Sequence, residues 1–333
     1  MQFGIGLHSG FEPKGFGRLV SQIENLGFSH LWVADEGLYR NPYASLTVAA
    51  LVSSRLSLGT GVTNPYTRHP ALTAASIATI DEFSHGRAVL GLAAGGSAVL
   101  ALSGAKPQPA LAVRDAIAII NSLTGTGRAV HDGPLWAFKG ALDFMPLRRV
   151  PIFLAATGVK MLRLAGAMAD GVILGDAATP RLVQAGLRHV EAGARDAQRP
   201  IGNFPAVAWC ATSISNNRGL AVDAVKRVVA VAVLNHRYRL AEIGLTPTVE
   251  MLRIAKQFGW RRTPASVEAL SEVLPEEVID LFALVGSVEA CASRIRMLAD
   301  EAISQFGVLL RPPQGSTFSE QLRLFAGGVM GRT

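Results

Sequence analysis

Strand-like and helix-like segments alternate along this chain, and that alternation limits its possible folds more than any other feature. Eight short runs rich in apolar and β-branched residues are each followed by a segment whose apolar residues have helical spacing. The expected strands span residues 3–8, 28–36, 56–64, 88–93, 150–158, 170–176, 204–214 and 304–310. Parallel strands joined by right-handed helical crossovers predict an α/β fold, a closed (β/α)₈ TIM barrel. An open doubly wound sheet is the alternative, because the number of strands alone does not show closure.

The seventh unit is longer than a single crossover helix requires. Residues 216–298 have a helical pattern that is interrupted near Gly244, Gly259 and Pro275. We expect a helical insertion in the seventh βα unit rather than a second domain, so that residues 1–333 form a single TIM-barrel domain. Residues 236–239 of this insertion are candidate substrate contacts, although helix surfaces carry such residues routinely.

Charge and targeting signals exclude several classes of function. The net charge is +7, but Lys and Arg are scattered, so we expect a small-molecule substrate and no nucleic-acid partner. The positive balance suits either general solubility or attraction of an anionic small molecule. No signal peptide is evident, and the uncharged residues 88–105 contain AAGGS, which favours a buried strand ending in a loop over a membrane span. Cys210 and Cys291 lie in apolar runs, which predicts no disulfide and a cytoplasmic location.

One stretch, GTGVTNPYTRHP at residues 59–70, weakens the strand in which it begins. Gly59 and Gly61 interrupt an apolar run, and a polar turn with two prolines follows at once. Glycine inside a strand usually marks a bulge or a close approach of backbone and ligand. The stretch therefore raises the question of which molecule, if any, lies against this backbone.

Candidate site residues come from the carboxyl ends of the expected strands, where barrel active sites form. Most of these positions hold small residues, which suits a broad, flat cofactor better than a compact metal centre. Asp35 and Glu36 are adjacent in a strand and should point to opposite faces, so we expect only one of them in the site. His8 is either a proton donor near a cofactor ring or a satisfied hydrogen-bonding residue.

Short motifs add one weak positive signal and several negative ones. The ATG at residues 156–158 lies between a strand and a helix, so its backbone N–H groups either hold a phosphate or serve only as a tight turn. No HExxH or paired CxxC is present, so we expect no metal site. The absence of GxSxG, of a Walker P-loop and of GxGxxG after the first strand counts against hydrolase, P-loop and Rossmann sites.

Three segments, residues 32–50, 59–92 and 156–175, together resemble the luciferase-like superfamily of flavin and deazaflavin oxidoreductases. More closely, they are similar to its branch that uses coenzyme F420, especially the methylenetetrahydromethanopterin reductases. The resemblance covers essentially the whole chain and is weakest over residues 216–281. Its most specific part is the GTGVTNPYTRHP stretch and the residues that follow it as far as SHGR.

The resemblance implies a position for the cofactor. In this family the third strand carries a bulge with a non-prolyl cis peptide, here the Gly61–Val62 bond, and the cofactor ring lies against it. The residues that it implies at the ring are Asp35, Gly61, Val62, Thr63 and Asn64, with Ala94, Gly95 and Gly96 in a nearby loop. The residues that it implies at the cofactor phosphate are Ala156, Thr157 and Gly158, and Gly175 at the next strand end completes the expected cofactor-binding set.

The chain departs from this family pattern at two glycines. The methylenetetrahydromethanopterin reductases carry carboxylates at the places of Gly6 and Gly96, and glycine can neither anchor a pterin nor move a proton. His8 or Glu36 are substitutes for this role, and with Asp35 they form the expected catalytic set.

Three hypotheses about function follow. The leading one is an F420-dependent oxidoreductase that transfers a hydride between the deazaflavin C5 and a C=N or activated C=C bond of a small organic substrate. The alternatives are an FMN-dependent luciferase-like monooxygenase and a catalytically silent barrel that binds a cofactor, the last motivated by Gly6 and Gly96. Members of the family are commonly dimers, so we expect a homodimer, with the apolar residues 43–53 as one possible contact and ordinary core as the other reading.

Overall fold

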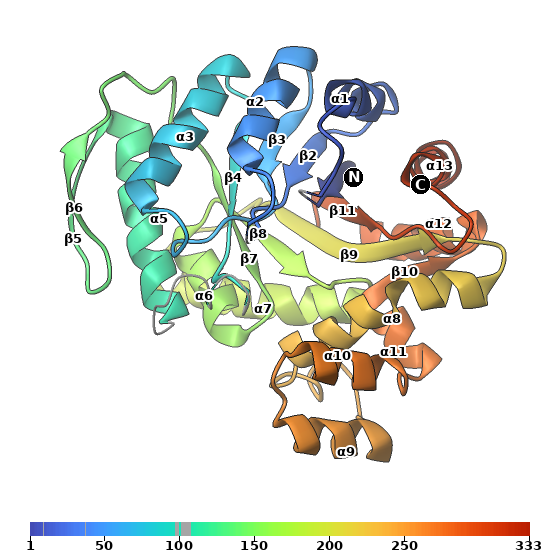
Figure 1. Ribbon diagram of the computed structural model, residues 1–333. Coiled ribbons are helices and arrows are strands. Elements are labelled where there is room, and N and C mark those ends of the chain that lie inside the picture. The colour runs from blue at the N-terminus through green and yellow to red at the C-terminus, as the bar shows by residue number, and fades with distance from the viewer. Residues whose placement is uncertain (9, 37, 97–99, 101–107) are drawn as a thin grey trace.

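Eight parallel strands close into a barrel in the computed structural model, which describes residues 1–8, 10–36, 38–96, 100 and 108–333 (Figure 1). The strands pair in the order β9–β11–β1–β2–β3–β4–β7–β8, and an additional pairing of β8 with β9 closes the cylinder. The fold is therefore the expected TIM barrel, and the open doubly wound sheet was the wrong alternative. The strand bounds are β1 (Gln2–Leu7), β2 (His30–Val33), β3 (Ser57–Thr60), β4 (Ala88–Leu92), β7 (Ile152–Ala156), β8 (Gly171–Gly175), β9 (Ala206–Ile214) and β11 (Gln305–Leu310).

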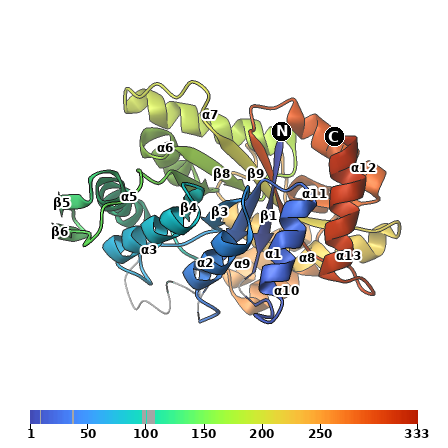
Figure 2. The same ribbon diagram turned by 90° about the horizontal axis from the view of Figure 1, so that it is seen from above.

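Helices surround the barrel, as the view from above shows (Figure 2). Their bounds are α1 (Phe16–Asn25), α2 (Pro42–Val52), α3 (Pro70–Phe83), α5 (Pro109–Thr126), α6 (Val159–Met168), α7 (Pro180–Asp196), α8 (Arg218–Asn235), α9 (Val249–Phe258), α10 (Pro264–Ser271), α11 (Glu276–Phe282), α12 (Val288–Ala299) and α13 (Phe318–Arg323). A two-stranded antiparallel ribbon of β5 (Arg128–Asp132) and β6 (Ala137–Ala141) lies outside the barrel beside α5 (Figure 1). Among the residues that the structure describes, no helix combines the length and apolar content that a bilayer crossing requires.

Local sequence signals set the starts of several helices. Asn41, His69 and Thr179 each accept a hydrogen bond from a backbone N–H group in the first turn of α2, α3 and α7. A proline follows each of these capping residues. Proline suits the first helical position because its φ is already helical and its missing N–H would have had no partner there. Each cap fixes the residue at which its helix begins, and therefore the residue at which the preceding loop ends.

The region after β9 contains a strand that the sequence pattern did not predict. Within residues 216–298, which were expected to be helical, β10 (Ala283–Gly286) pairs in parallel with residues 211–214 of β9. β8 pairs with residues 206–209 of β9, and β11 pairs along the other edge. The nine-residue β9 therefore shares one edge between β8 and β10. A four-residue apolar run such as ALVG cannot be told from a buried helical segment by periodicity, which explains the difference.

The SHGR sequence at residues 84–87 has a structural role at the amino-terminal end of the barrel. The Arg87 guanidinium donates hydrogen bonds to the carbonyl oxygens of Ala50 (3.3 Å), Ser53 (2.8 Å) and Ser84 (2.8 Å). These oxygens lie at the carboxyl ends of α2 and α3, where helix carbonyls lack intrahelical partners. Arg87 therefore joins both helices to the start of β4, far from the strand ends where a site is expected.

Two indole side chains fill the barrel interior and form a floor beneath the carboxyl ends of the strands. Trp32 of β2 and Trp209 of β9 are buried, and their ring centroids lie 5.9 Å apart. A Cβ atom built on Gly59 would lie 2.6 Å from the Trp32 ring, and one on Gly61 would lie 2.7 Å from the Trp209 ring. Real atoms do not approach so closely, so the glycines of this stretch make room for the two indoles.

Candidate active site

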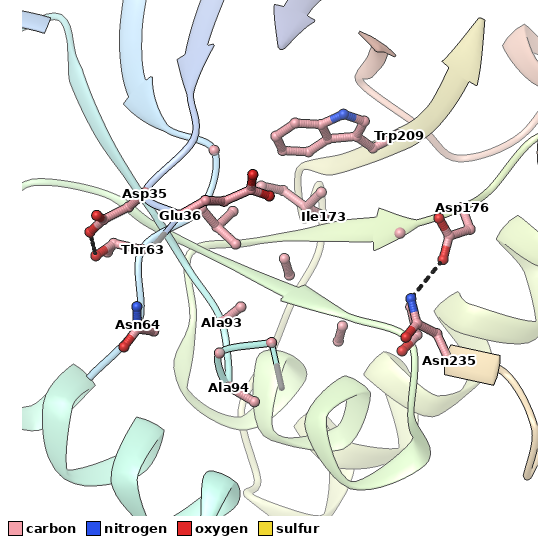
Figure 3. A pocket seen from close by; sticks show the side chains of 18 of the residues that line it. Asp35, Glu36, Thr63, Asn64, Ala93, Ala94, Ile173, Asp176, Trp209 and Asn235 are labelled. Atoms are coloured by element: carbon pink, nitrogen blue, oxygen red, sulfur yellow. Dashed lines mark hydrogen bonds between the residues drawn. The ribbon is translucent and has the colours of Figure 1, made fainter. Parts of the chain in front are cut away.

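A cavity of about 620 Å³ opens at the carboxyl ends of the barrel strands, within the usual size range of small-molecule sites (Figure 3). Every residue expected from the sequence to bind cofactor or to act in catalysis lines it. These residues are His8, Asp35, Glu36, Gly61, Val62, Thr63, Asn64, Ala94, Gly95, Gly96, Ala156, Thr157, Gly158 and Gly175. The fold thus brings together side chains and backbone from the ends of β1, β2, β3, β4, β7 and β8.

The backbone between Thr60 and Thr63 bulges into this cavity. The Thr63 N–H donates to the Gly91 carbonyl oxygen at 2.9 Å, and the Thr60 hydroxyl donates to the same oxygen at 2.7 Å. Gly61 and Val62, which lie between them, are joined by a cis peptide bond, as the resemblance implied. Because β4 holds both flanks, the bulge presents a fixed backbone surface to the cavity.

Asn64 shapes the turn that follows the bulge. Its side-chain oxygen accepts hydrogen bonds from the N–H groups of Tyr66 (2.9 Å) and Thr67 (3.0 Å), and its Nδ2 donates to the Thr67 hydroxyl at 3.1 Å. Asn side chains commonly close such turns by bonding to the backbone two residues later. Asn64 is buried, so this turn forms a rigid wall of the cavity.

Asp35 and Glu36 point in opposite directions, as their alternation along the chain predicts (Figure 3). Asp35 Oδ2 accepts hydrogen bonds from the Thr63 hydroxyl at 2.6 Å and from Arg68 Nη1 at 3.2 Å. The Arg68 guanidinium also lies over the Tyr43 ring, 4.5 Å from its centroid. Asp35 is thus engaged beside the bulge, and these contacts suit positioning better than proton transfer.

Glu36 instead faces His8. His8 Nε2 lies 2.7 Å from Glu36 Oε2, and both side chains are about half exposed. His8 Nδ1 accepts a hydrogen bond from the Gly10 N–H at 3.0 Å, so the proton of the neutral imidazole is on Nε2, where it donates to Glu36. The Tyr39 ring packs edge-on against the imidazole at 4.6 Å. An imidazole and a carboxylate at this separation can pass a proton between them.

The turn from β7 to α6 leaves backbone donors available. Helix α6 has no side-chain cap, and its N-cap residue is Gly158. Across the described part of the chain, no acceptor pairs with the Gly158 N–H, and a Cβ atom built on Gly158 would meet nothing within 4 Å. Lys160 lies exposed in the first turn of α6. Free N–H groups, the helix dipole and open space together favour an anion such as phosphate.

The side of the cavity opposite Asp35 carries a second polar group. Asp176 adopts a left-handed backbone conformation (φ 60°) and accepts a hydrogen bond from Asn235 Nδ2 at 3.4 Å (Figure 3). Burial raises the pKa of Asp176 to about 6, while the Asn235 hydrogen bond and the nearby charge of Arg262 act against that rise. Asp176 can therefore exchange a proton close to neutral pH.

Several cavity residues were not among the sequence candidates, and Trp209, Asn235 and Arg262 are three of them. Trp209 lies in the middle of β9, and Asn235 and Arg262 come from the region after β9. Their positions depend on strand register and on how α8 and α10 pack, neither of which can be read from residue order. The one signal in the sequence was that the barrel strands contain both tryptophan and interior glycines. Only the strand register shows which glycine faces which tryptophan.

Comparison with known proteins identifies the family. The model of the luciferase-like monooxygenase family matches residues 1–305. The chain belongs to this luciferase-like family. The 5,10-methylenetetrahydromethanopterin reductases of Archaeoglobus fulgidus and Methanolobus tindarius are 34% and 31% identical to it, each over 99% of this chain and over 99% and 100% of their own lengths. A solved structure, the coenzyme F420 dependent tetrahydromethanopterin reductase from Methanopyrus kandleri, matches with a TM-score of 0.84 and 27% identity over 99% of this chain and 98% of that one.

The barrel of this luciferase-like chain explains one of its two unexpected glycines. A Cβ atom on Gly6 would lie 2.4 Å from Leu309 Cδ2 and 3.0 Å from the Trp209 ring, so no acidic side chain fits at this position. At Gly96 the nearest atom, Arg262 Nη1, lies 3.8 Å from such a Cβ, so the space there is open. Leu309 and Trp209 together therefore occupy the place that an acid on the first strand would take.

The residues of this luciferase-like site fit a cofactor with a flat ring and a phosphate. The bulge offers a flat face at Val62, with Ile173 and Leu309 as further apolar lining. The open cradle at Gly158 offers N–H donors for the phosphate. Within the described residues, no group of three or more His, Cys, Asp or Glu side chains is placed to hold a metal ion.

Proposed function

We propose that this protein is an F420-dependent oxidoreductase that transfers a hydride between the deazaflavin C5 and a C=N or activated C=C bond of a small organic substrate. The observation that carries the proposal is that one cavity contains both the Gly61–Val62 bulge and the uncapped start of α6. The F420-dependent relative from Methanopyrus kandleri supports the same cofactor. FMN, the alternative cofactor, would use the same two features of the cavity.

In this proposal the protein binds the cofactor, orients its ring and shields the ring from water. Gly61 and Val62 would hold the cofactor ring, and Asp35 with Thr63 holds that surface in place. The backbone N–H groups at Gly158 would hold its phosphate. Reduced F420 supplies the hydride when bound, and the indole floor keeps water from the ring from below.

We assign the accompanying proton to the pair of His8 and Glu36. Reduction of C=N or C=C adds a hydride to one atom and a proton to the other, so the site needs a proton donor within reach of the substrate. The pair lines the cavity and its two side chains lie 2.7 Å apart and are about half exposed. After the pair takes up one proton from solvent, Glu36 as the carboxylic acid can donate that proton to the substrate, while the His8 imidazole stays neutral and its Nε2–H donates a hydrogen bond to Glu36. The pair takes the role that carboxylates at Gly6 and Gly96 would have had.

Parallel titration with F420 and with FMN tests the cofactor. The expected result is quenching or enhancement of cofactor fluorescence with a dissociation constant for F420 at least about tenfold below that for FMN, a difference of about 1.4 kcal/mol. Tighter binding of FMN would contradict the proposal and favour a monooxygenase. Binding of neither cofactor would contradict both and leave a barrel without its cofactor. Binding of F420 without turnover of any unsaturated substrate would support a silent barrel.

We also propose that the protein is a homodimer that associates through α2 and α3. These helices lie side by side on one flank of the barrel (Figure 2). They expose large apolar side chains, namely Val48, Leu51, Val52, Leu72 and Phe83. A helix such as α2 that is apolar around its whole circumference is usually covered on both sides.

A further inference from the structure

Three polar side chains at the carboxyl end of α8 reach the ends of two barrel strands. Asn235 Nδ2 donates to the Asp176 carboxylate, as described above, and His236 Nε2 lies 3.3 Å from the Gly175 carbonyl oxygen at the end of β8. Arg239 Nη1 donates to the Thr157 carbonyl oxygen, just after β7, at 2.7 Å. Residues 235–239 thus dock on the ends of β7 and β8, although they lie about sixty residues or more farther along the chain.

Arg239 is the most constrained of the three. Its side chain is only 4% exposed and does not line the cavity, so it is not placed to contact a ligand itself. Its Nε donates to Glu242 Oε2 at 2.8 Å, and Glu242 Oε1 lies 3.0 Å from His189 Nε2 of α7. A buried guanidinium with a carboxylate partner on one side has its remaining donors fixed in direction, because the group is planar. The hydrogen bond from Arg239 to the Thr157 carbonyl oxygen is therefore fixed in direction.

This hydrogen bond acts on the turn from β7 to α6, which offers the free N–H groups. The carbonyl of Thr157 and the N–H of Gly158 belong to one planar trans peptide unit and point in opposite directions. A bond that holds the carbonyl toward Arg239 therefore aims the Gly158 N–H away from Arg239. Gly158 has no side-chain cap and open space around it, so little else fixes its orientation.

We propose that Arg239 is a positioning residue that orients the β7–α6 turn for the phosphate of the cofactor. This inference rests on the proposed function, because it concerns the same cofactor. It assigns Arg239 and His236 inward structural contacts in place of the substrate contacts expected for residues 236–239. Of that group, Tyr238 is the residue that remains largely exposed.

Binding measurements with two ligands test the role of Arg239. One ligand is F420, and the other is its riboflavin-like fragment, which has the deazaflavin ring and the ribityl chain but no phosphate. For Arg239→Met, the dissociation constant for F420 should rise about tenfold or more, while that for the fragment should change less than about twofold. Arg239→Lys keeps a donor but loses the planar fork, so it should weaken F420 binding by an intermediate factor and leave the fragment unaffected.

Arg237→Met is the matched control, because Arg237 lies in the same turn and has the same charge. Its guanidinium bonds to the Leu234 carbonyl and lies over the Tyr238 ring, without contact to Thr157. Equal weakening by the Arg237 and Arg239 variants would show that only net charge matters and would overturn the proposal. So would equal loss of F420 and fragment binding in Arg239→Lys. A wild-type protein that binds neither ligand would instead reject the proposed cofactor, so the two failures are distinguishable.

Discussion

His8 and Glu36 are adjacent in space because β1 and β2 pair in parallel and end at the same level. Leu7 pairs with Val33 at the ends of the two strands, and the chain continues past them to His8 and to Glu36. The N–H of Gly10 fixes the tautomer of the imidazole, so that its single proton faces the carboxylate. In the proposed function this hydrogen bond positions Glu36, which takes up a proton from solvent and donates it to the substrate.

The variant Glu36→Gln isolates the proton step. The amide keeps the size and can accept the His8 hydrogen bond, but it cannot take up a proton. Turnover of any substrate that the wild-type protein reduces should fall about 100-fold, with the dissociation constant for F420 changed less than about twofold. Steady-state kinetics and a cofactor titration measure the two quantities. Glu12→Gln is the control, because Glu12 is an exposed carboxylate that does not line the cavity. Equal turnover of both variants would remove the pair from the mechanism.

At the scale of elements, the packing of β3 against its neighbours depends on glycine in and just after this strand. Gly59 faces the indole from β2, and Gly61 faces the indole from β9. The absence of side chains at these two glycines leaves the space in the barrel interior that the two indoles fill. The same absence leaves the backbone bare at the point where the bulge enters the cavity.

The variant Gly61→Ala should show the cost of filling that space. Its Cβ would lie 2.7 Å from both Trp209 Cη2 and Trp32 Cβ, and neither atom is the free end of a flexible chain. Overpacking of this kind should lower the free energy of unfolding by about 1–3 kcal/mol, measured by chemical denaturation. Gly202→Ala, where a Cβ meets nothing within 4 Å, is the control. An unchanged midpoint for Gly61→Ala would mean that the indoles are free to move.

Elements differ in how far the sequence predicts them, and particular residues explain why. The barrel strands were readable because each is an apolar run bounded by turn signals, and the helix starts were readable because Asn41 and Thr179 precede prolines. β10 was not, because its four residues carry no periodicity of their own. The inward direction of Arg239 was not readable either, since HRYR looks the same on an exposed helix end as on a docked one.

The site was predictable to the extent that it is built from strand ends and from the resemblance. All of the residues expected to bind cofactor or to act in catalysis line one cavity, because parallel strands in a barrel end on the same face, whereas residues 236–239, the expected substrate contacts, do not line it. The contacts between them, such as His8 with Glu36 and Asp35 with Thr63, required the register. The far wall at Asn235 and Arg262 required the packing of a region where the resemblance is weakest.

At the scale of the whole molecule, the exposed apolar flank of α2 and α3 predicts association. Wild-type protein should elute at twice the mass of a single chain in size-exclusion chromatography with light scattering. Leu51, 68% exposed on α2, is the most accessible of its apolar side chains. Leu51→Asp buries a charge in the expected interface and should shift the protein to monomer at micromolar concentration.

Val130→Asp serves as the matched control for this experiment. Val130 is also exposed and apolar, but it lies in β5 of the outer ribbon, away from α2 and α3. This variant should remain dimeric. Dissociation by both substitutions would indicate a different interface, and a monomeric wild-type protein would contradict the dimer outright.

The contact between Gly6 and Trp209 also makes two positions about two hundred residues apart depend on each other. Leu309 lies still nearer to Gly6, so an acid on β1 needs space from both β9 and β11. Sequences with this fold that carry an acid at the place of Gly6 should therefore carry smaller residues at the places of Leu309 and Trp209. An exchange at Gly6 alone would produce a clash, so the residues that can act at the end of β1 depend on the packing of the barrel interior.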